Sequence, residues 1–344
     1  MRKTAIYTLL AATLLVPAGC NNKDNSTGTE AQEYIKLWMQ EYHPGISAST
    51  NGIYILEDTP GDGSVWDSEK AYSLLNVTIR GLNGKITSTG HENYAKQLGT
   101  YQTGNYYGPS VTATEYGYAG VEAILTGMRV GGTRTAVVPS WLLTTDRYNS
   151  QKEYLNACTS TTHLIYTITF SGQMEDVQEW EIGLLKDYVK AEFGSGILPI
   201  SIDNDSAEKD LFYFVSDQSG VTDLTEIGSG VSYRLNYTGR LLNGQVFDTT
   251  SEKIAKDNGI YDSSKTYEPV TIKTADEMDE YTLGGSNSIV TGFKGGLSQL
   301  KYVGEKGVAL FTSDLGYTSS GSGSKIPGYA PLRFDLEVVS IIED

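Results

Sequence analysis

The sequence predicts an α+β protein that contains one fold twice. Its 344 residues correspond to about two domains of ordinary size. A short amphipathic helix is expected at 31–42 and a second one at 174–193, and each precedes a strand-rich half of the chain. Each half also has an Asn-Gly pair between alternating strands, at 83–84 and at 243–244, which is a strong signal for a β-hairpin.

The two halves predict the same order of elements. In the first half, the helix ends at Pro44-Gly45 and is followed by these expected elements: a strand at 53–56, a hairpin around 77–86, a short helix at 119–125, and strands at 133–142 and 163–170. In the second half, the apolar stripe of the helix is Val177, Trp180, Leu184, Leu185 and Val189, and Gly194 ends it. The remaining elements of that half are a strand at 211–215, a hairpin around 237–248, a short helix from 291, and strands at 306–315 and 332–341. Each copy is therefore expected to be an antiparallel sheet that wraps around one short helix.

Composition excludes several classes of protein. The formal net charge is −16 and no basic stripe is evident, so binding to nucleic acid is not expected. Two cysteines do not make a disulfide framework, and three scattered histidines do not favour a metal site. We expect no cofactor and a monomeric chain.

The N-terminus predicts export and lipidation. Two basic residues, Arg2 and Lys3, precede an apolar run that is too short to span a bilayer, and small residues follow it up to Cys20. Residues 1–19 resemble a bacterial lipoprotein signal peptide, which would leave Cys20 as the lipid-bearing N-terminus. The polar segment 20–30 is then a tether. The expected location is the bacterial cell envelope, with the protein anchored to the membrane through Cys20 and facing the periplasm or the cell surface; an ordinary secreted protein is the alternative.

Residues 230–342 resemble the FKBP family of peptidyl-prolyl isomerases. The motifs that carry the resemblance are YTGRLLNGQVFD, IVTGFKGGLSQL, VGEKGVALFTSDLGY and IPGYAPLRFDLEVVSI, in the order of the family. The resemblance implies a half-barrel sheet with a substrate pocket between its concave face and the short helix, in a domain that spans 173–344 together with the preceding helix. Proline-containing polypeptides are the implied partners.

The resemblance also implies roles for individual residues. The positions expected to carry catalysis are Tyr237, Phe247, Asp248 and Tyr317, and those expected to bind substrate are Ile289, Val290, Phe293, Ile326 and Phe334. Tyr317 would donate a hydrogen bond to a substrate carbonyl, Asp248 would polarise the pocket, and a backbone N–H near Ile289 would hold the peptide. Three features depart from the family pattern: Phe293 replaces a common Trp, Ser288 stands at a position that is often acidic, and 251–280 is a long insertion.

An aromatic pocket of this kind suits proline isomerisation. The barrier to rotation about an X–Pro bond is about 18–20 kcal/mol, because resonance stabilises the planar amide. A dry cup that favours the twisted amide by about 6–8 kcal/mol accelerates the reaction by roughly 10⁴ to 10⁶ without covalent chemistry.

The first copy, 31–172, lacks this set of residues. Aligned through the Asn-Gly pairs, Val77, Thr87, Ser88, Val121 and Thr144 stand near the positions of Tyr237, Phe247, Asp248, Phe293 and Tyr317. We therefore expect a degenerate domain with no isomerase activity, and an insertion at 143–162 on the rim of its former pocket. Its tyrosines at 101, 106, 107, 116 and 118 are either a binding site for a partner or a glycan, or ordinary packing.

Two functions remain open on the sequence alone. The first is a lipid-anchored isomerase that acts on envelope proteins. The second is a non-catalytic lipoprotein that binds unfolded chains, a surface partner or a glycan. In the second case, apolar residues of the insertion would fold over the pocket and narrow it; they are Ile254, Ile260, Tyr261, Tyr267 and Pro269.

Overall fold

The computed structural model describes residues 26–114, 117–202, 211–222 and 224–343. The expected signal peptide, Cys20 and most of the expected tether lie outside these ranges, as does Tyr116. The last tether residues do not form a separate linker, because the first helix begins at Ser26. Among the helices that the structure describes, none is long and apolar enough to cross a membrane.

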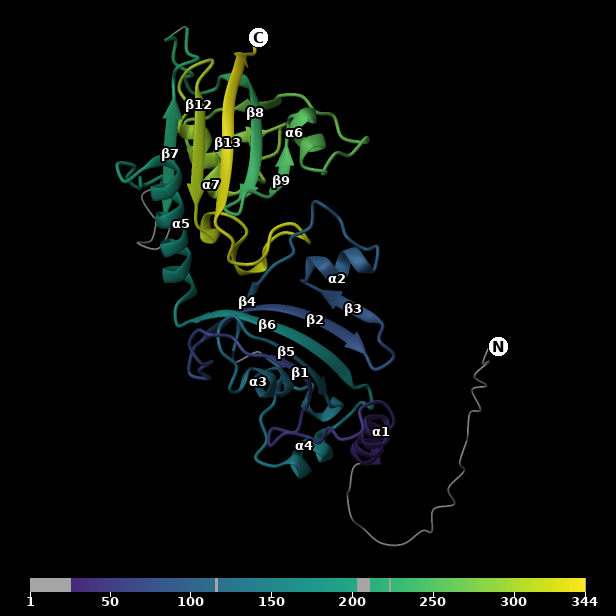
Figure 1. The fold of residues 1–344 in the computed structure, drawn as a ribbon. Helices are drawn as coiled ribbons and strands as arrows, with labels where there is room; N and C mark the ends of the chain where they lie inside the picture. The colour runs from purple at the N-terminus through teal and green to yellow at the C-terminus, as the bar shows by residue number, and fades with distance from the viewer. Residues whose placement is uncertain (1–25, 115–116, 203–210, 223, 344) are drawn as a thin grey trace.

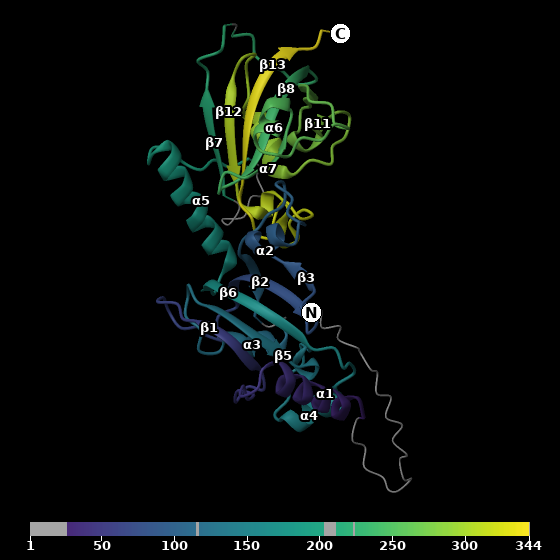
Figure 2. The same ribbon diagram turned by 45° about the vertical axis from the view of Figure 1, so that its right-hand side comes forward.

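The chain forms two domains, each with one antiparallel sheet (Figure 1). The elements of the first domain are α1 (Ser26–Tyr42), β1 (Tyr54–Thr59), β2 (Tyr72–Gly81), β3 (Ile86–Thr89), α2 (Glu92–Gln97), β4 (Ser110–Ala113), α3 (Ala119–Leu125), β5 (Thr133–Val138), the 3₁₀ turn η1 (Ser140–Leu142), α4 (Gln151–Ala157) and β6 (Leu164–Met174). Helix α5 (Val177–Phe193) follows directly and runs from the end of the first sheet to the second domain (Figure 2).

The second domain repeats the series. Its elements are β7 (Phe212–Asp217), β8 (Ser232–Leu241), β9 (Val246–Thr249), α6 (Glu252–Asp257), β10 (Val270–Lys273), η2 (Met278–Glu280), β11 (Thr282–Leu283), α7 (Thr291–Gln299), β12 (Lys306–Phe311), η3 (Ser313–Leu315), η4 (Thr318–Ser320) and β13 (Leu332–Ile341).

The two sheets have the same topology, which confirms the predicted repeat and the α+β class. The first has the strand order β1-β5-β6-β2-β3, with β4 also on β2. The second contains the order β7-β12-β13-β8, with β9 and β10 both on β8 and the short β11 added to β10. The register agrees as well, since Val77 pairs with Ile168 and Tyr237, 160 residues after Val77, pairs with Leu336.

Both hairpins form where the Asn-Gly pairs predicted them. Gly84 and Gly244 turn the chain between β2 and β3 and between β8 and β9, with φ of 81° and 89°. This left-handed conformation costs glycine little and other residues more, which is why the pair is a reliable signal.

Helix α5 buries three of the five residues of the expected stripe, and adds Glu181 to them. Asp176 caps its N-terminus by accepting hydrogen bonds from two backbone amides, and Gly194, at φ 87°, ends it. The buried residues are Val177, Glu181, Leu185 and Val189. Leu184, which we placed on the apolar stripe, is 40% exposed. The spacing of four brings Glu181 to the buried face, where a charged residue gives no hydrophobic signal.

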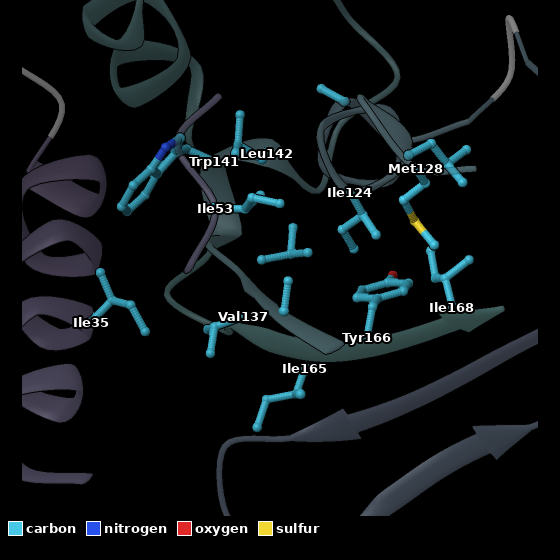
Figure 3. Close-up of a cluster of buried hydrophobic side chains, with 14 of the residues drawn as sticks. Ile35, Ile53, Ile124, Met128, Val137, Trp141, Leu142, Ile165, Tyr166 and Ile168 are labelled. Carbon is cyan, nitrogen blue, oxygen red and sulfur yellow. The ribbon is translucent and has the colours of Figure 1, made fainter. Parts of the chain in front are cut away.

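Each domain has its own core. Figure 3 shows the first, in which Ile35 of α1 and Ile124 of α3 lie in one cluster with Val137, Ile165 and Ile168 of the sheet. In the second domain, α7 packs its apolar residues against β12 and β13, while α5 covers Tyr213 and Leu310 on the other side of the sheet. The N-terminal end of α7 and the strands that face it border a pocket.

Candidate active site

All nine residues expected at the pocket line a single cavity of the second domain, of about 510 Å³. They come from four segments: Tyr237, Phe247 and Asp248 from the β8–β9 hairpin, Ile289, Val290 and Phe293 from the start of α7, Tyr317 and Ile326 from the loop after β12, and Phe334 from β13. The cavity therefore depends on the whole domain rather than on one motif.

Phe334 is the centre of the aromatic wall. Its ring contacts Phe293 edge-on with centroids 4.8 Å apart, and contacts Phe247 edge-on at 5.6 Å. Tyr237 meets the ring of Phe293 edge-on at 5.5 Å. Behind this layer, Phe311 stacks on Phe334 at 5.8 Å and is fully buried. Edge-to-face aromatic pairs each add roughly 0.5–1.5 kcal/mol beyond their area burial, so these contacts stabilise the packing of the cup.

Asp248 forms the polar edge of the cavity. One carboxylate oxygen accepts a hydrogen bond from the Tyr237 hydroxyl at 2.5 Å, and the other accepts from the Thr249 backbone N–H at 3.0 Å. Lys265 forms an ion pair with the same carboxylate. These partners fix the carboxylate at the edge of the aromatic cup.

The two tyrosines at this edge are held in their neutral form. Burial, followed by the charge of Asp248, raises the pKa of Tyr237 far above its ordinary value. Burial and the same carboxylate also raise the pKa of Tyr317. Both phenols are therefore hydrogen-bond donors at any physiological pH.

The chain enters α7 through an extended residue, Val290, at φ −64° and ψ 145°. The Ile289 N–H donates to the Asn287 carbonyl at 2.8 Å. The backbone donor that we expect near Ile289 is therefore the next amide, that of Val290, rather than Ile289 itself.

Sequence reasoning missed several residues of this site. Leu283, Ser322 and Lys325 line the cavity, as does Ser288, which we had noted only as a departure from the family pattern. Lys265 is 17 residues from Asp248, in a loop with no motif of its own, so only the folded chain shows the ion pair. Among the described residues, no group of three or more His, Cys, Asp or Glu side chains is arranged to bind a metal ion.

The expected narrowing of the pocket by the 251–280 segment is wrong. None of Ile254, Ile260, Tyr261, Tyr267 and Pro269 lines the cavity. Tyr261 stacks instead on Tyr267, with centroids 5.4 Å apart, and the Asp262 N–H donates to the Tyr267 hydroxyl at 2.9 Å. The loop closes on itself, and its Lys265 forms an ion pair with Asp248 at the edge of the pocket.

The same loop is present in the first domain. Tyr101 stacks on Tyr107 with centroids 5.2 Å apart, and the Gln102 N–H donates to the Tyr107 hydroxyl at 3.1 Å. These three residues precede their counterparts Tyr261, Asp262 and Tyr267 by 160 positions. The segment is thus shared by both copies.

The first domain places small or polar residues where the second has its cup. The register puts Val77 at the position of Tyr237, and Thr87 and Ser88 at those of Phe247 and Asp248. Helices α3 and α7 begin at equivalent points, which puts Val121 at the position of Phe293. Arg147, from the 143–162 segment, donates to the Gly117 carbonyl at 3.0 Å and to Glu122 at 2.8 Å, so this segment covers the entry to α3.

Comparison with known proteins agrees with this geometry. Residues 225–339 match the family described as FKBP-type peptidyl-prolyl cis-trans isomerase. FK506-binding protein 2 of Dictyostelium discoideum is 32% identical over 113 residues, which are 33% of this chain and 67% of that protein. Peptidyl-prolyl cis-trans isomerase FKBP15-1 of Arabidopsis thaliana is 31% identical over 134 residues, 35% of this chain and 72% of that protein.

A solved structure of the three FKBP domains of wheat FKBP73 covers 87% of this chain and 100% of its own, at 14% identity and a TM-score of 0.28. On the family match and the two relatives, the chain belongs to the FKBP-type peptidyl-prolyl cis-trans isomerase family, through its second domain.

Proposed function

We propose that the second domain isomerises X–Pro bonds in proteins of the bacterial cell envelope, and that the first domain has no isomerase activity. The observation that supports this most strongly is the cavity itself. It joins an aromatic cup of Tyr237, Phe247, Phe293 and Phe334 to one fixed carboxylate, Asp248.

The cup suits the proline ring and the twisted amide. The rings of Phe247, Phe293 and Phe334 are buried, so this part of the cavity replaces water by an apolar surface. A twisted amide has less charge separation than a planar one. Its transfer from water to an apolar surface therefore costs less hydration free energy than that of the planar amide. The cup therefore binds the transition state better than either ground state, which is the condition for catalysis.

The polar edge orients the peptide. Tyr317 donates to a substrate carbonyl, and the Val290 N–H holds the chain at the entry to α7. Asp248 does not act as a general base, because it is already engaged by Tyr237, Thr249 and Lys265. Its role is to fix the Tyr237 ring and the electrostatic field of the cavity.

The N-terminal sequence supports the envelope location. The signal-like residues 1–19 and Cys20 resemble those of a bacterial lipoprotein, so the two domains are presented on the outer side of a membrane. Proline-containing chains that fold in that compartment are the proposed substrates.

The test is an exchange measurement by NMR on an X–Pro peptide, with the chain lacking residues 1–19. The wild type is expected to accelerate cis–trans exchange, and a Phe247→Ala, Asp248→Ala variant is expected to reduce the rate to that of the free peptide. The matched control is Thr87→Ala, Ser88→Ala, at the equivalent positions of the first domain, which is expected to keep the wild-type rate.

Catalysis that persists in the Phe247→Ala, Asp248→Ala variant but is lost in the Thr87→Ala, Ser88→Ala variant would assign the activity to the first domain and contradict the proposal. A folded wild type that binds the peptide without accelerating exchange would favour the non-catalytic binding protein instead.

A further inference from the structure

The first domain touches the second next to the pocket. Residues 101–109 of the first domain, called the bracing loop below, project toward the 318–331 loop of the second domain, and both views show the two segments side by side (Figures 1 and 2). The Tyr106 N–H donates to the Ser324 carbonyl at 2.7 Å. The Ser324 hydroxyl donates to Asn105 Oδ1, also at 2.7 Å.

Ser324 lies at the tip of a small turn that carries three residues of the cavity. The turn is closed by hydrogen bonds between Ser322 and Ile326, from N–H to carbonyl in both directions, at 2.8 and 3.2 Å. Ser322, Lys325 and Ile326 line the pocket on this turn. The bracing loop therefore binds the outer side of a turn whose inner side is a wall of the site.

The bracing loop also contacts the β8–β9 hairpin. The Gln245 side-chain amide of the β8–β9 turn donates to the Gly104 carbonyl at 3.2 Å. Gln245 is two residues before Phe247, whose ring is part of the cup. One loop of the first domain thus connects the hairpin that carries Phe247 and Asp248 to the turn that carries Ile326.

The fit between the domains is close at this point. A Cβ atom on Gly104 would lie 3.2 Å from Cγ2 of Ile260, and one on Gly259 would lie 2.7 Å from Cγ2 of Thr103. The half-buried ring of Tyr106 packs against the hydrophobic core of the second domain, and Tyr72 meets Tyr329 edge-on with centroids 5.9 Å apart. The bracing loop is therefore seated between three surface segments of the isomerase domain.

We propose that the bracing loop is a positioning element of the isomerase site, through which the first domain holds the 322–326 turn and the β8–β9 hairpin at the spacing that the substrate requires. This proposal rests on the proposed function of the second domain. Tyr106 and Asn105 are its positioning residues and do not touch the substrate. Without them, the turn that carries Ile326 moves away from the cavity more often, and the cavity binds peptide less tightly. The aromatic residues of the cup keep their positions.

The first experiment is a double-mutant cycle on the hydrogen bond between the domains, in the chain lacking residues 1–19. Asn105→Ala and Ser324→Ala each remove one partner, and the double variant removes both. NMR exchange on an X–Pro peptide gives kcat and KM for each protein. We expect KM to rise about threefold in each single variant and no further in the double variant, with kcat changed less than twofold.

The second experiment measures how strongly the bracing loop holds the 322–326 turn. Amide hydrogen exchange at Ile326 is expected to be at least tenfold faster in Tyr106→Ala than in wild type, with a rise in KM for the peptide. Tyr42→Ala is the matched control, because Tyr42 is a 64% exposed tyrosine of α1 in the same domain. It is expected to change neither quantity.

The outcomes separate the two proposals. Unchanged Ile326 exchange in Tyr106→Ala, or faster exchange with an unchanged KM, overturns the bracing role while isomerase activity stands. Additive effects of Asn105→Ala and Ser324→Ala on KM also overturn it, since they show that the two residues act independently. A wild-type protein with no turnover overturns the proposed function, and with it the role of the brace in catalysis.

Discussion

Gly239 of β8 lies directly beneath the ring of Phe247. A Cβ atom at Gly239 would be 2.4 Å from Cε2 of Phe247 and 2.9 Å from Cε1 of Phe334. The aromatic wall therefore depends on a position without a side chain. The first domain shows the reverse exchange at the equivalent pair, with Ile79 in place of Gly239 and Thr87 in place of Phe247.

Gly239→Ala is expected to displace the ring of Phe247 and disturb the cup. Such overpacking costs about 1–3 kcal/mol of unfolding free energy, and we expect a loss of at least about tenfold in kcat/KM. Urea unfolding and peptide exchange measure the two effects. Gly183→Ala on α5, where a Cβ meets nothing within 4 Å, is the control and is expected to stabilise the protein slightly without changing activity. Full activity in Gly239→Ala would show that the cup tolerates a displaced Phe247.

Tyr237→Phe is expected to lower kcat/KM by about tenfold. The change removes the hydroxyl that donates to Asp248 at 2.5 Å and keeps the ring against Phe293. A hydrogen bond to a charged group contributes about 1.5–3 kcal/mol, and the carboxylate keeps its contacts with Thr249 and Lys265. Tyr261→Phe, outside the cavity, is the control. Equal rates for Tyr237→Phe and wild type would contradict a catalytic role for this hydroxyl.

Glu181 is expected to make stability depend on pH. It is 1% exposed, and burial raises the pKa of its carboxyl to about 7, with a further contribution from nearby Asp314. One oxygen accepts from the Ser313 N–H at 3.2 Å, and the other has no hydrogen-bond partner among the described residues. The folded state thus favours the protonated form.

The sign follows from this difference between the folded and unfolded states. The pKa of the Glu181 carboxyl is higher in the folded protein than in the unfolded chain. Its contribution to the free energy of unfolding is therefore fully present below the unfolded pKa of about 4.3. That contribution is lost as pH rises through about 7. The free energy of unfolding of Glu181→Gln minus that of wild type is expected to increase by up to about 3 kcal/mol from pH 4.5 to pH 7. Above pH 7 this difference is expected to stay constant. Urea unfolding at several pH values checks this, with the exposed Glu179→Gln as control. A constant difference between Glu181→Gln and wild type across that range would rule out the titration.

Cys20→Ser is expected to release the protein from the membrane. Lipidation needs the cysteine thiol, so the serine variant of the full-length chain should be found in the soluble fraction of a bacterial envelope preparation, whereas wild type is found with the membrane. Radiolabelled fatty acid should mark wild type alone. Cys158→Ser, which removes the other cysteine, is the control. A Cys20→Ser protein that stays with the membrane would contradict the anchor.

The sequence predicted what depends on local pattern. Hairpins at Asn83-Gly84 and Asn243-Gly244 follow from turn chemistry, whereas the positions of the nine pocket residues came from the resemblance of four motifs to the FKBP family. It did not predict Lys265 beside Asp248, or Glu181 on the buried face of α5, because a charged side chain gives the same signal whether it is paired, buried or solvated. The contact of Asn105 with Ser324 between the domains joins residues 219 positions apart and leaves no periodic trace in the sequence.

The repeated loop has an evolutionary consequence. Asn105 and Lys265 occupy the same position in the two copies, 160 residues apart, yet Lys265 serves Asp248 in its own domain while Asn105 reaches the neighbouring one. After a duplication, a copy that loses its pocket is normally free to drift or to be deleted. Under the proposed bracing role, a change in the loop of the first domain would impair the site of the second, so the two domains are expected to be retained together.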